Sequence, residues 1–268
     1  MNVTAPEQAV LRAAEVLVEA AETQVPCPPV RDLIGADDLV AAYAVQERVT
    51  AARIANGATV VGRKIGLTSA AVQQQIGVDT PDFGVLFDDM QFHDGDTIPA
   101  DAVLQPRAEA EIAFVLAKDL VEGDLGYDDV RSAIAYAVAA IEVCGSRIAN
   151  WDISFGDTVA DNASAGVYVL GTERRTLDQF EPRDVTMSMT VDGVEVSTGT
   201  GAACLDDPVN AVVWLARQAR EFGEPLRAGQ VILSGALGPM QPITSGNTVR
   251  STVSSLGSVS FTVGGGQS

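Results

Sequence analysis

The chain has 268 residues, which is enough to bury a substantial core as one large domain or two small ones. Its hydrophobic fraction of 47% and charged fraction of 20% are typical of a globular protein. The formal net charge of −19 argues against a nucleic-acid binder and a binder of anionic membranes, because both need a basic surface. An anionic substrate would need a local positive centre, such as a metal ion or a lysine.

Cysteine and histidine usage narrows the chemistry further. The cysteines, Cys27, Cys144 and Cys204, are scattered and odd in number, which suggests no disulfide framework and favours a reducing cytoplasm. The N-terminus shows no basic-then-apolar signal, and no run of about 18 apolar residues could span a membrane. The single histidine, His93, lies in a turn-like sequence and excludes a multi-histidine metal site.

The first part of the chain predicts helices that serve packing. An apolar stripe at helical spacing runs through residues 5–23 and stops at a run of prolines that begins with Pro26. Asp37 and Asp38 can cap a second helix that ends after about Ile54. We therefore expect an N-terminal helical region over residues 1–58, followed by a catalytic unit over residues 59–263.

Residues 59–68 read as a strand that runs into a loop. Lys64 lies in this apolar run with glycines on both sides. It is either an edge-strand residue with its ammonium group in water or a functional cation in a cleft. These residues alone leave both interpretations open.

Loop sequences follow this strand. Thr68 is a fair cap for a short helix that ends before Gly77. Residues 79–84 have turn chemistry, and an aspartate before Phe-Gly, here Asp82, is usually a turn former.

Residues 103–118 carry the pattern around which the chain is organised. Read with period two, the apolar residues at even positions from 110 to 116 share one face, while Glu109 and Glu111 share the other. On a strand the two glutamates lie about 7 Å apart and point the same way, so they repel unless a cation lies between them. The alternative is a half-exposed strand with a solvated acidic face.

A third acid stands out further along. Tyr127–Ile141 predicts a helix capped around Asp128, and it leads into an apolar segment that Glu142 interrupts. A lone buried carboxylate costs several kcal/mol unless it is paired, protonated or bound to metal. Arg147 is the only obvious basic neighbour in the sequence.

The remaining chain predicts strands and one more helix. An Asp-Gly turn joins the two halves of a hairpin, and Pro208 marks a helix start. The predicted elements are strands at 167–170, 187–191, 194–197, 231–234 and 258–263 and a helix at 209–222. Because strands and helices do not alternate regularly, we expect an α+β fold with a mixed, largely antiparallel sheet. The tail, 264–268, is expected to be disordered.

Glu109, Glu111, Glu142, Lys64 and Asp82 together are suited to a hard divalent cation with acid–base chemistry beside it. Mg²⁺ prefers oxygen ligands and keeps several waters, which leaves room for a bidentate substrate. Composition alone does not show that these five side chains meet.

Five separated blocks of the sequence carry a family resemblance: VGRKIGLT, GVDTPDFG, LQPRAEAEIA, TVADNAS and SGALGPM. They resemble the 2-keto-4-pentenoate (2-hydroxypenta-2,4-dienoate) hydratases of the fumarylacetoacetate hydrolase superfamily. The resemblance extends from about Arg31 to Val263. It implies a mixed, mostly antiparallel β-roll with an N-terminal helical region, a Mg²⁺ or Mn²⁺ cofactor and a homo-oligomer.

The resemblance also implies site residues. The matching positions are Glu109, Glu111 and Glu142 for the metal, Lys64 and Asp82 for catalysis, and Leu67 and Ser164 for the substrate. The implied activity is hydration of a small anionic 2-hydroxyalka-2,4-dienoate to a 4-hydroxy-2-oxoalkanoate in aromatic or sterol meta-cleavage catabolism. A complex with the aldolase that takes the next step would fit such a pathway.

Related enzymes with other activities differ from this sequence at particular residues. Hydrolases of the superfamily that cleave carbon–carbon bonds use a histidine–glutamate pair, and His93 does not occupy a matching motif. Oxalocrotonate-type decarboxylases tend to lack the aspartate that matches Asp82 and have a histidine where Gln105 stands. Decarboxylation, or a non-catalytic role as partner of a decarboxylase, remains the alternative to hydration.

Overall fold

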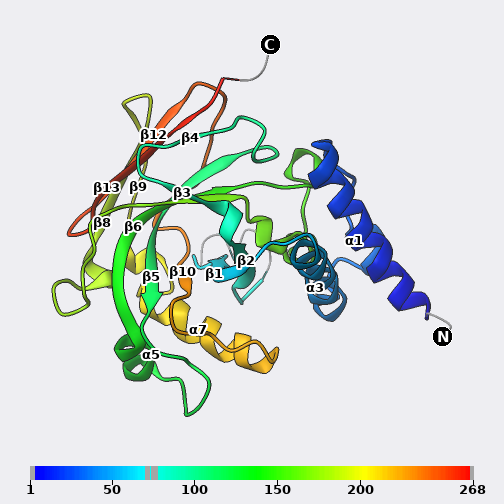
Figure 1. The fold of residues 1–268 in the computed structure, drawn as a ribbon, viewed down its shortest axis with the longest axis horizontal. Helices are drawn as coiled ribbons and strands as arrows, with labels where there is room; N and C mark the ends of the chain where they lie inside the picture. Colours follow the sequence, from blue (N-terminus) through cyan, green and yellow to red (C-terminus); the bar gives the residue numbers. More distant parts are fainter. Residues whose placement is uncertain (1–3, 70–72, 74–77, 266–268) are drawn as a thin grey trace.

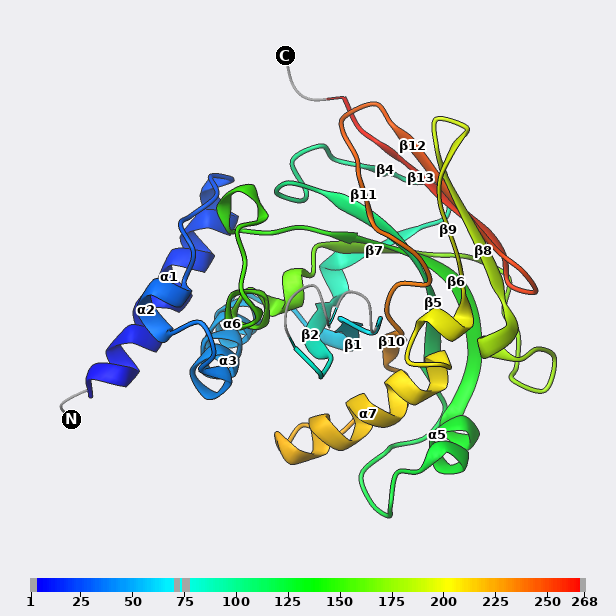
Figure 2. The ribbon, with the colours of Figure 1, turned by 180° about the vertical axis from the view of Figure 1, so that it is seen from behind.

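The computed structural model of the protein describes residues 4–69, 73 and 78–265. Helices gather on one side and sheets on the other, with further helices beneath the sheets (Figures 1 and 2). Most of the helix predicted after Thr68, and the last residues of the tail, lie outside the described residues. No helix in the described part of the chain is long and apolar enough to cross a membrane.

The helical side has its own apolar core, which includes Leu17, Val45 and Val159. Its helices are α1 (Ala5–Thr23), α2 (Arg31–Ile34), α3 (Leu39–Ala55) and α6 (Phe155–Ala160). The Thr4 hydroxyl caps α1 and the Asp38 carboxylate caps α3, as polar residues do at helix starts. The two helices predicted in this part of the chain are confirmed.

The larger sheet has the strand order β2-β1-β10-β5-β6-β7-β3, with β11 also paired to β5. Its strands are β1 (Val60–Gly66), β2 (Asp82–Phe87), β3 (Gln91–His93), β5 (Arg107–Leu116), β6 (Ile134–Cys144), β7 (Val167–Leu170), β10 (Val231–Leu233) and β11 (Gln241–Pro242). The pairs β1–β10 and β3–β7 are parallel and the others are antiparallel.

The smaller sheet has the order β4-β13-β12-β8-β9. Its strands are β4 (Thr97–Ile98), β8 (Thr186–Val191), β9 (Val194–Thr200), β12 (Thr248–Val253) and β13 (Gly257–Val263). Only the β4–β13 pair is parallel. The predicted fold class, a mixed and mostly antiparallel α+β fold, is confirmed.

The apolar face of β5 lies in the main core, as its period-two pattern predicts. Ala110, Ile112 and Phe114 are at most 1% exposed and join side chains of both sheets and of two further helices. These helices are α5 (Tyr127–Ala133) and α7 (Pro208–Glu221), the latter capped by Asp207. Short 3₁₀ turns lie at Asp88–Met90, Ala149–Trp151, Asn162–Ser164, Pro182–Asp184 and Gly201–Ala203.

Two sequence-based predictions of local structure are wrong. The helix predicted over Tyr127–Ile141 ends at Ala133, and Ile134 begins the central strand β6. The alanines of this segment favour a helix locally, but pairing with both β5 and β7 buries the segment as a strand. Asp82, predicted as a turn former, instead opens strand β2, where Phe83 and its neighbours pair with β1.

Candidate metal centre and active site

Three carboxylates meet on one face of the larger sheet. Glu109 and Glu111 alternate with core residues on β5, and antiparallel pairing places Glu142 of β6 directly opposite Glu109. Glu109 is 5% exposed, Glu111 0% and Glu142 1%. The acidic face is therefore buried, which excludes the solvated-face alternative. We call these three residues the carboxylate cluster.

The carboxylate cluster has fewer hydrogen-bond donors than acceptors. Glu111 Oε2 accepts the Gly235 N–H at 2.7 Å, and Glu109 Oε1 accepts the Cys144 thiol at 3.3 Å. In the described part of the chain, Glu111 Oε1 and both oxygens of Glu142 accept no hydrogen bond. Glu142 Oε2 has the Lys64 ammonium 3.4 Å away, whereas Glu111 Oε1 and Glu142 Oε1 have neither a hydrogen bond nor an ion pair among the described residues. Buried polar atoms are nearly always paired, so these two oxygens indicate a missing electropositive partner.

The electrostatics of the carboxylate cluster point the same way. Burial, followed by the charges of Glu142 and Glu109, raises the pKa of Glu111 well above its ordinary value. Burial likewise raises the pKa of Glu142 to about 7, although the Lys64 ammonium opposes the shift. A cation bound here would relieve both effects, and oxygen-rich donors suit Mg²⁺ or Mn²⁺. The donor set fits a hard divalent ion.

Lys64 lies inside the sheet and not at its edge, because β1 is flanked by β2 and β10. Its side chain is 3% exposed, its Nζ donates to the Ala163 carbonyl at 3.0 Å, and Nζ lies 3.4 Å from Glu142 Oε2. Burial lowers the pKa of Lys64, but the surrounding acids, with Glu142 first among them, raise it further, so the net shift is upward. The solvated-edge interpretation is wrong, and Lys64 rather than Arg147 is the basic neighbour of Glu142.

Asp82 faces Lys64 across a glycine. Asp82 pairs with Gly66 in the β1–β2 register, and a Cβ atom at Gly66 would lie 2.2 Å from Asp82 Oδ1 and 3.4 Å from Lys64 Nζ. Asp82 is 1% exposed, and burial raises its pKa while Lys64 lowers it. Oδ1 accepts no hydrogen bond from any described residue. A buried carboxyl group beside an ammonium group is suited to exchange protons.

A residue that the sequence did not indicate connects Asp82 to Ser164. The Thr158 hydroxyl lies 3.3 Å from Asp82 Oδ2 and 3.3 Å from the Ser164 hydroxyl. Thr158 is 6% exposed and comes from α6. The only feature of the sequence that pointed to Thr158 was its place in the block TVADNAS, three residues before Asp161.

The turn at Asn162–Ser164 has an unusual backbone. Asn162, Ala163 and Ser164 have φ angles of 54°, 50° and 55°, a region that non-glycine residues rarely adopt. The Asn162 side chain holds the turn against β2 by accepting the Val85 N–H at 2.7 Å and donating to the Val85 carbonyl at 3.0 Å. This turn presents the Ala163 carbonyl to Lys64.

Leu67, the other predicted substrate contact, lies directly after β1. It also has a positive φ angle, 55°, and its partly buried side chain packs against the helical core. Strained backbone at Leu67 and at Ser164 therefore flanks the Lys64–Asp82 pair.

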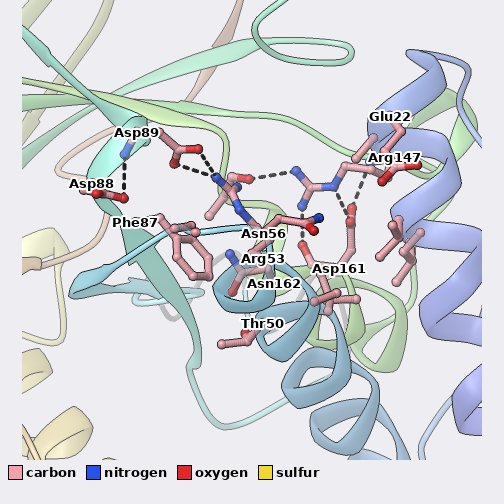
Figure 3. Close-up of a pocket in the computed structure, with 18 residues that line it drawn as sticks. Glu22, Thr50, Arg53, Asn56, Phe87, Asp88, Asp89, Arg147, Asp161 and Asn162 are labelled. Atoms are coloured by element: carbon pink, nitrogen blue, oxygen red, sulfur yellow. Dashed lines mark hydrogen bonds and ion pairs between the residues drawn. The ribbon is translucent and has the colours of Figure 1, made fainter.

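A cavity of about 500 Å³ lies apart from these residues, between α1, α3 and the turn (Figure 3). Two ion pairs form part of its wall: Arg53 with Asp89, and Arg147 with Asp161. None of the predicted catalytic, metal or substrate residues lines it. It backs the turn through Asn162 and is not the predicted active site.

The family model described as fumarylacetoacetate (FAA) hydrolase C-terminal matches residues 59–264. The chain therefore belongs to the fumarylacetoacetate hydrolase family, as its sequence blocks predict. This assignment defines the class of protein but not the reaction.

Relatives within the family are more specific. The chain is 53% identical to the TodF product hydratase of Pseudomonas putida strain F1, with 96% of each chain covered. It is 51% identical to 2-keto-4-pentenoate hydratase of Paraburkholderia xenovorans, with 92% of each covered. The chain thus belongs to the family of the 2-keto-4-pentenoate hydratases, and the recognition made from sequence is confirmed.

A solved structure shows the same fold over nearly the whole chain. The 4-oxalocrotonate decarboxylase of Pseudomonas putida G7, complexed with magnesium and adipate, superposes with a TM-score of 0.92. It is 32% identical and covers 98% of this chain and 100% of its own. One fold therefore serves proteins named as hydratases and as a decarboxylase, and the reaction has to be argued from the site.

Proposed function

We propose that this protein is a metal-dependent hydratase that adds water to a 2-hydroxyalka-2,4-dienoate and yields a 4-hydroxy-2-oxoalkanoate. The observation that carries the proposal is the carboxylate cluster with unpaired oxygens beside the buried Lys64–Asp82 pair. The names of two relatives, a hydratase of 2-keto-4-pentenoate and a hydratase of 2-hydroxyhexa-2,4-dienoate, support the same reaction.

Glu109, Glu111 and Glu142 would hold the cofactor, Mg²⁺ or Mn²⁺. When bound, the ion supplies a Lewis acid and a template for the carboxylate and C2 oxygen of the substrate. The Gly235 N–H fixes one oxygen of Glu111 and the Cys144 thiol fixes one oxygen of Glu109, so each of these carboxylates is oriented. The magnesium complex of the related decarboxylase supports the choice of ion.

Lys64 and Asp82 would carry the proton chemistry. Protonation at the far end of the dienol gives an α,β-unsaturated ketone, whose C4 then accepts water. The Lys64 ammonium, fixed by the Ala163 carbonyl and by Glu142, balances the negative charge of the enolate or carboxylate. Asp82 moves protons, and its raised pKa lets it hold a proton nearer neutral pH than an exposed aspartate does. Leu67 and Ser164 would contact the substrate.

Decarboxylation of an oxalocrotonate-like diacid is the second candidate, because the structural match to a decarboxylase covers nearly the whole chain. Gln105 argues against decarboxylation, because it stands where oxalocrotonate-type decarboxylases have a histidine. Its side-chain amide donates to the Ser146 and Ile148 carbonyls at 2.9 and 2.7 Å and accepts the Asn150 N–H at 2.7 Å. A residue so fully engaged holds a loop and has no donor left for a substrate.

A turnover panel tests the proposal. Ring-cleavage dienoates and the corresponding diacid are offered to the enzyme with Mg²⁺, with Mn²⁺, and after treatment with EDTA. We expect hydration of a dienoate that disappears with EDTA and returns with either metal. Release of CO₂ from the diacid, with no hydration of any dienoate, would contradict the proposal and favour the decarboxylase.

The assembly and the compartment complete the proposal. A homo-oligomer and a complex with the aldolase that consumes the product are expected, together with a reducing cytoplasm that keeps Cys27, Cys144 and Cys204 as thiols. All three are free cysteines and buried, which supports the last point. Light scattering of the protein alone and mixed with the aldolase tests the first two.

A further inference from the structure

The Cys144 thiol lies within the carboxylate cluster and has no role in the hydration proposed above beyond orienting Glu109. Cys144 follows Glu142 by two residues on β6, so both side chains point to the same face, and Cys144 lies diagonally across from Glu109. Its Sγ is 3.3 Å from Glu109 Oε1, and Cys144 is 2% exposed. One ligand atom each from Glu109, Glu142 and Cys144 lies within 4.8 Å of the others.

A second observation shows that this group has unused capacity. Glu142 is 1% exposed, and its Oε1 has neither a hydrogen bond nor an ion pair with any residue that the structure describes, while its Oε2 has only the Lys64 ammonium at 3.4 Å. The Cys144 thiol donates to a carboxylate, whereas the Cys204 thiol donates to a backbone carbonyl, that of Ser234, at 3.0 Å. Cys27 differs too, because it lies beside Arg147 and Asp161 and not beside the carboxylate cluster.

The donor chemistry distinguishes two kinds of ion. Mg²⁺ takes oxygen ligands and gains little from a sulfur atom, whereas thiolate ligands select softer ions. Two carboxylates and one thiolate, with a fourth position left open, form a donor set that Zn²⁺ accepts in tetrahedral geometry. Glu109, Glu142 and Cys144 are therefore suited to Zn²⁺ or a similar soft ion, whereas the all-oxygen set of Glu109, Glu111 and Glu142 is suited to Mg²⁺.

We propose that Glu109, Glu142 and Cys144 form a cation site for a thiophilic divalent ion such as Zn²⁺ or Cd²⁺, overlapping the site of the hard catalytic ion. Binding breaks the S–H bond, forms a metal–sulfur bond and releases the proton to the buffer, with no change of oxidation state. Because both sites use Glu109 and Glu142, the two ions exclude one another. The mutual exclusion of the two ions rests on the proposed function, because it assumes the catalytic metal site. Binding of a thiophilic ion by Cys144 does not depend on that assumption.

Cadmium titration of the metal-free protein tests the thiolate ligand directly. A cadmium–thiolate bond absorbs in the ultraviolet, so the absorbance reports the bond without any assay of turnover. We expect a saturable band at one equivalent in the wild type and in Cys27→Ser, the matched control for a buried thiol elsewhere. In Cys144→Ser the band should be absent and cadmium affinity at least about tenfold weaker.

Circular dichroism of Cys144→Ser, and of Cys144→Ala as a second variant, checks that each is folded. A band that persists in a folded Cys144 variant would overturn the proposal, because another thiol would then be the ligand. A wild-type protein that binds cadmium without the band would overturn it as well.

Competition tests the overlap. Mn²⁺ bound to the protein loses the electron paramagnetic resonance signal of the free ion, so displacement by Cd²⁺ restores that signal. We expect stoichiometric displacement from the wild type and from Cys27→Ser, and displacement only at about tenfold or more higher cadmium concentration from Cys144→Ser. Simultaneous binding of both ions would overturn the overlap. A cadmium band in a protein that hydrates no dienoate would overturn the proposed function and leave the thiolate site standing.

Discussion

Two clusters of charged residues adjoin the Asn162–Ser164 turn: the Arg147–Asp161 pair and the carboxylate cluster. They differ in how completely their charged groups are hydrogen-bonded. Arg147 donates to the carboxylate of Asp161 and, at 2.8 Å, to the Ala165 carbonyl, while the backbone N–H of Arg147 donates to the same carboxylate at 2.9 Å. The carboxylate cluster instead leaves Glu111 Oε1 and Glu142 Oε1 without a donor among the described residues. A saturated cluster fixes structure, whereas an unsaturated one is suited to receive a ligand.

Glu142→Gln breaks the unsaturated cluster and should have the largest effect. It removes a negative charge and a proposed ligand, so we expect metal affinity to fall by at least about 100-fold and turnover to approach background. Calorimetry with Mn²⁺ measures the affinity. Glu173→Gln, which changes an exposed glutamate paired with Arg175, is the control and should match the wild type. A metal-soaked crystal with the ion bound by none of the three glutamates would refute the assignment.

Asp82→Asn tests the acid beside the carboxylate cluster. The amide keeps the size of the side chain but cannot carry the proton, so we expect kcat to fall by about 10²–10⁴-fold while the fold is unchanged. Steady-state kinetics and circular dichroism measure the two. Asp79→Asn, an exposed position three residues earlier, serves as the control. Normal turnover of Asp82→Asn would exclude a role in proton transfer.

Arg147→Ala breaks the saturated cluster. It removes the guanidinium that neutralises Asp161, whose side chain is 2% exposed, and the loss of one member of a buried ion pair costs about 3–5 kcal/mol. Urea denaturation should show this loss in the free energy of unfolding. Arg53→Ala breaks an ion pair whose side chains are 37% and 60% exposed, and should cost about 0–1 kcal/mol. Equal losses in the two variants would contradict the comparison.

Lys64→Ala removes the ammonium group from the proposed active site. We expect kcat/KM to fall at least about tenfold, which corresponds to about 1.4 kcal/mol of transition-state stabilisation. Lys64→Arg should restore little, because a planar guanidinium does not replace a compact ammonium in the space between Glu142 and the Ala163 carbonyl. Metal affinity, measured by calorimetry, should not fall. An activity loss explained wholly by weaker metal binding would argue against this role of Lys64.

Thr158→Val should produce the smallest change, a shift in pH dependence. The Thr158 hydroxyl stabilises the ionised form of Asp82, so its loss should raise the pKa of Asp82 further. The limb of the pH–rate profile that reports Asp82 should then move to higher pH. Thr158→Ser keeps the hydroxyl and should leave the limb in place. A limb that does not move in Thr158→Val would show that this hydrogen bond is absent in solution.

The sequence predicted what local pattern determines. Period two on β5 identified both the core face and the acidic face, the aspartates before residue 39 located the start of α3, and Pro208 located the start of α7. It could not predict what distant pairing determines. The helix predicted across β6 was wrong because two neighbouring strands decide that segment, and Thr158 was missed because α6 reaches Asp82 only in the folded chain.

Gly66 shows how little separates an active member of this fold from an inert one. The φ angle of Gly66 is not positive, so the backbone at this position can accept a residue with a side chain. A methyl group at Gly66 is excluded only because it would occupy the place of the Asp82 carboxylate. Gly66→Ala would therefore displace the proposed proton carrier, Asp82, while leaving the pairing of strands β1 and β2 and the other acidic residues in place.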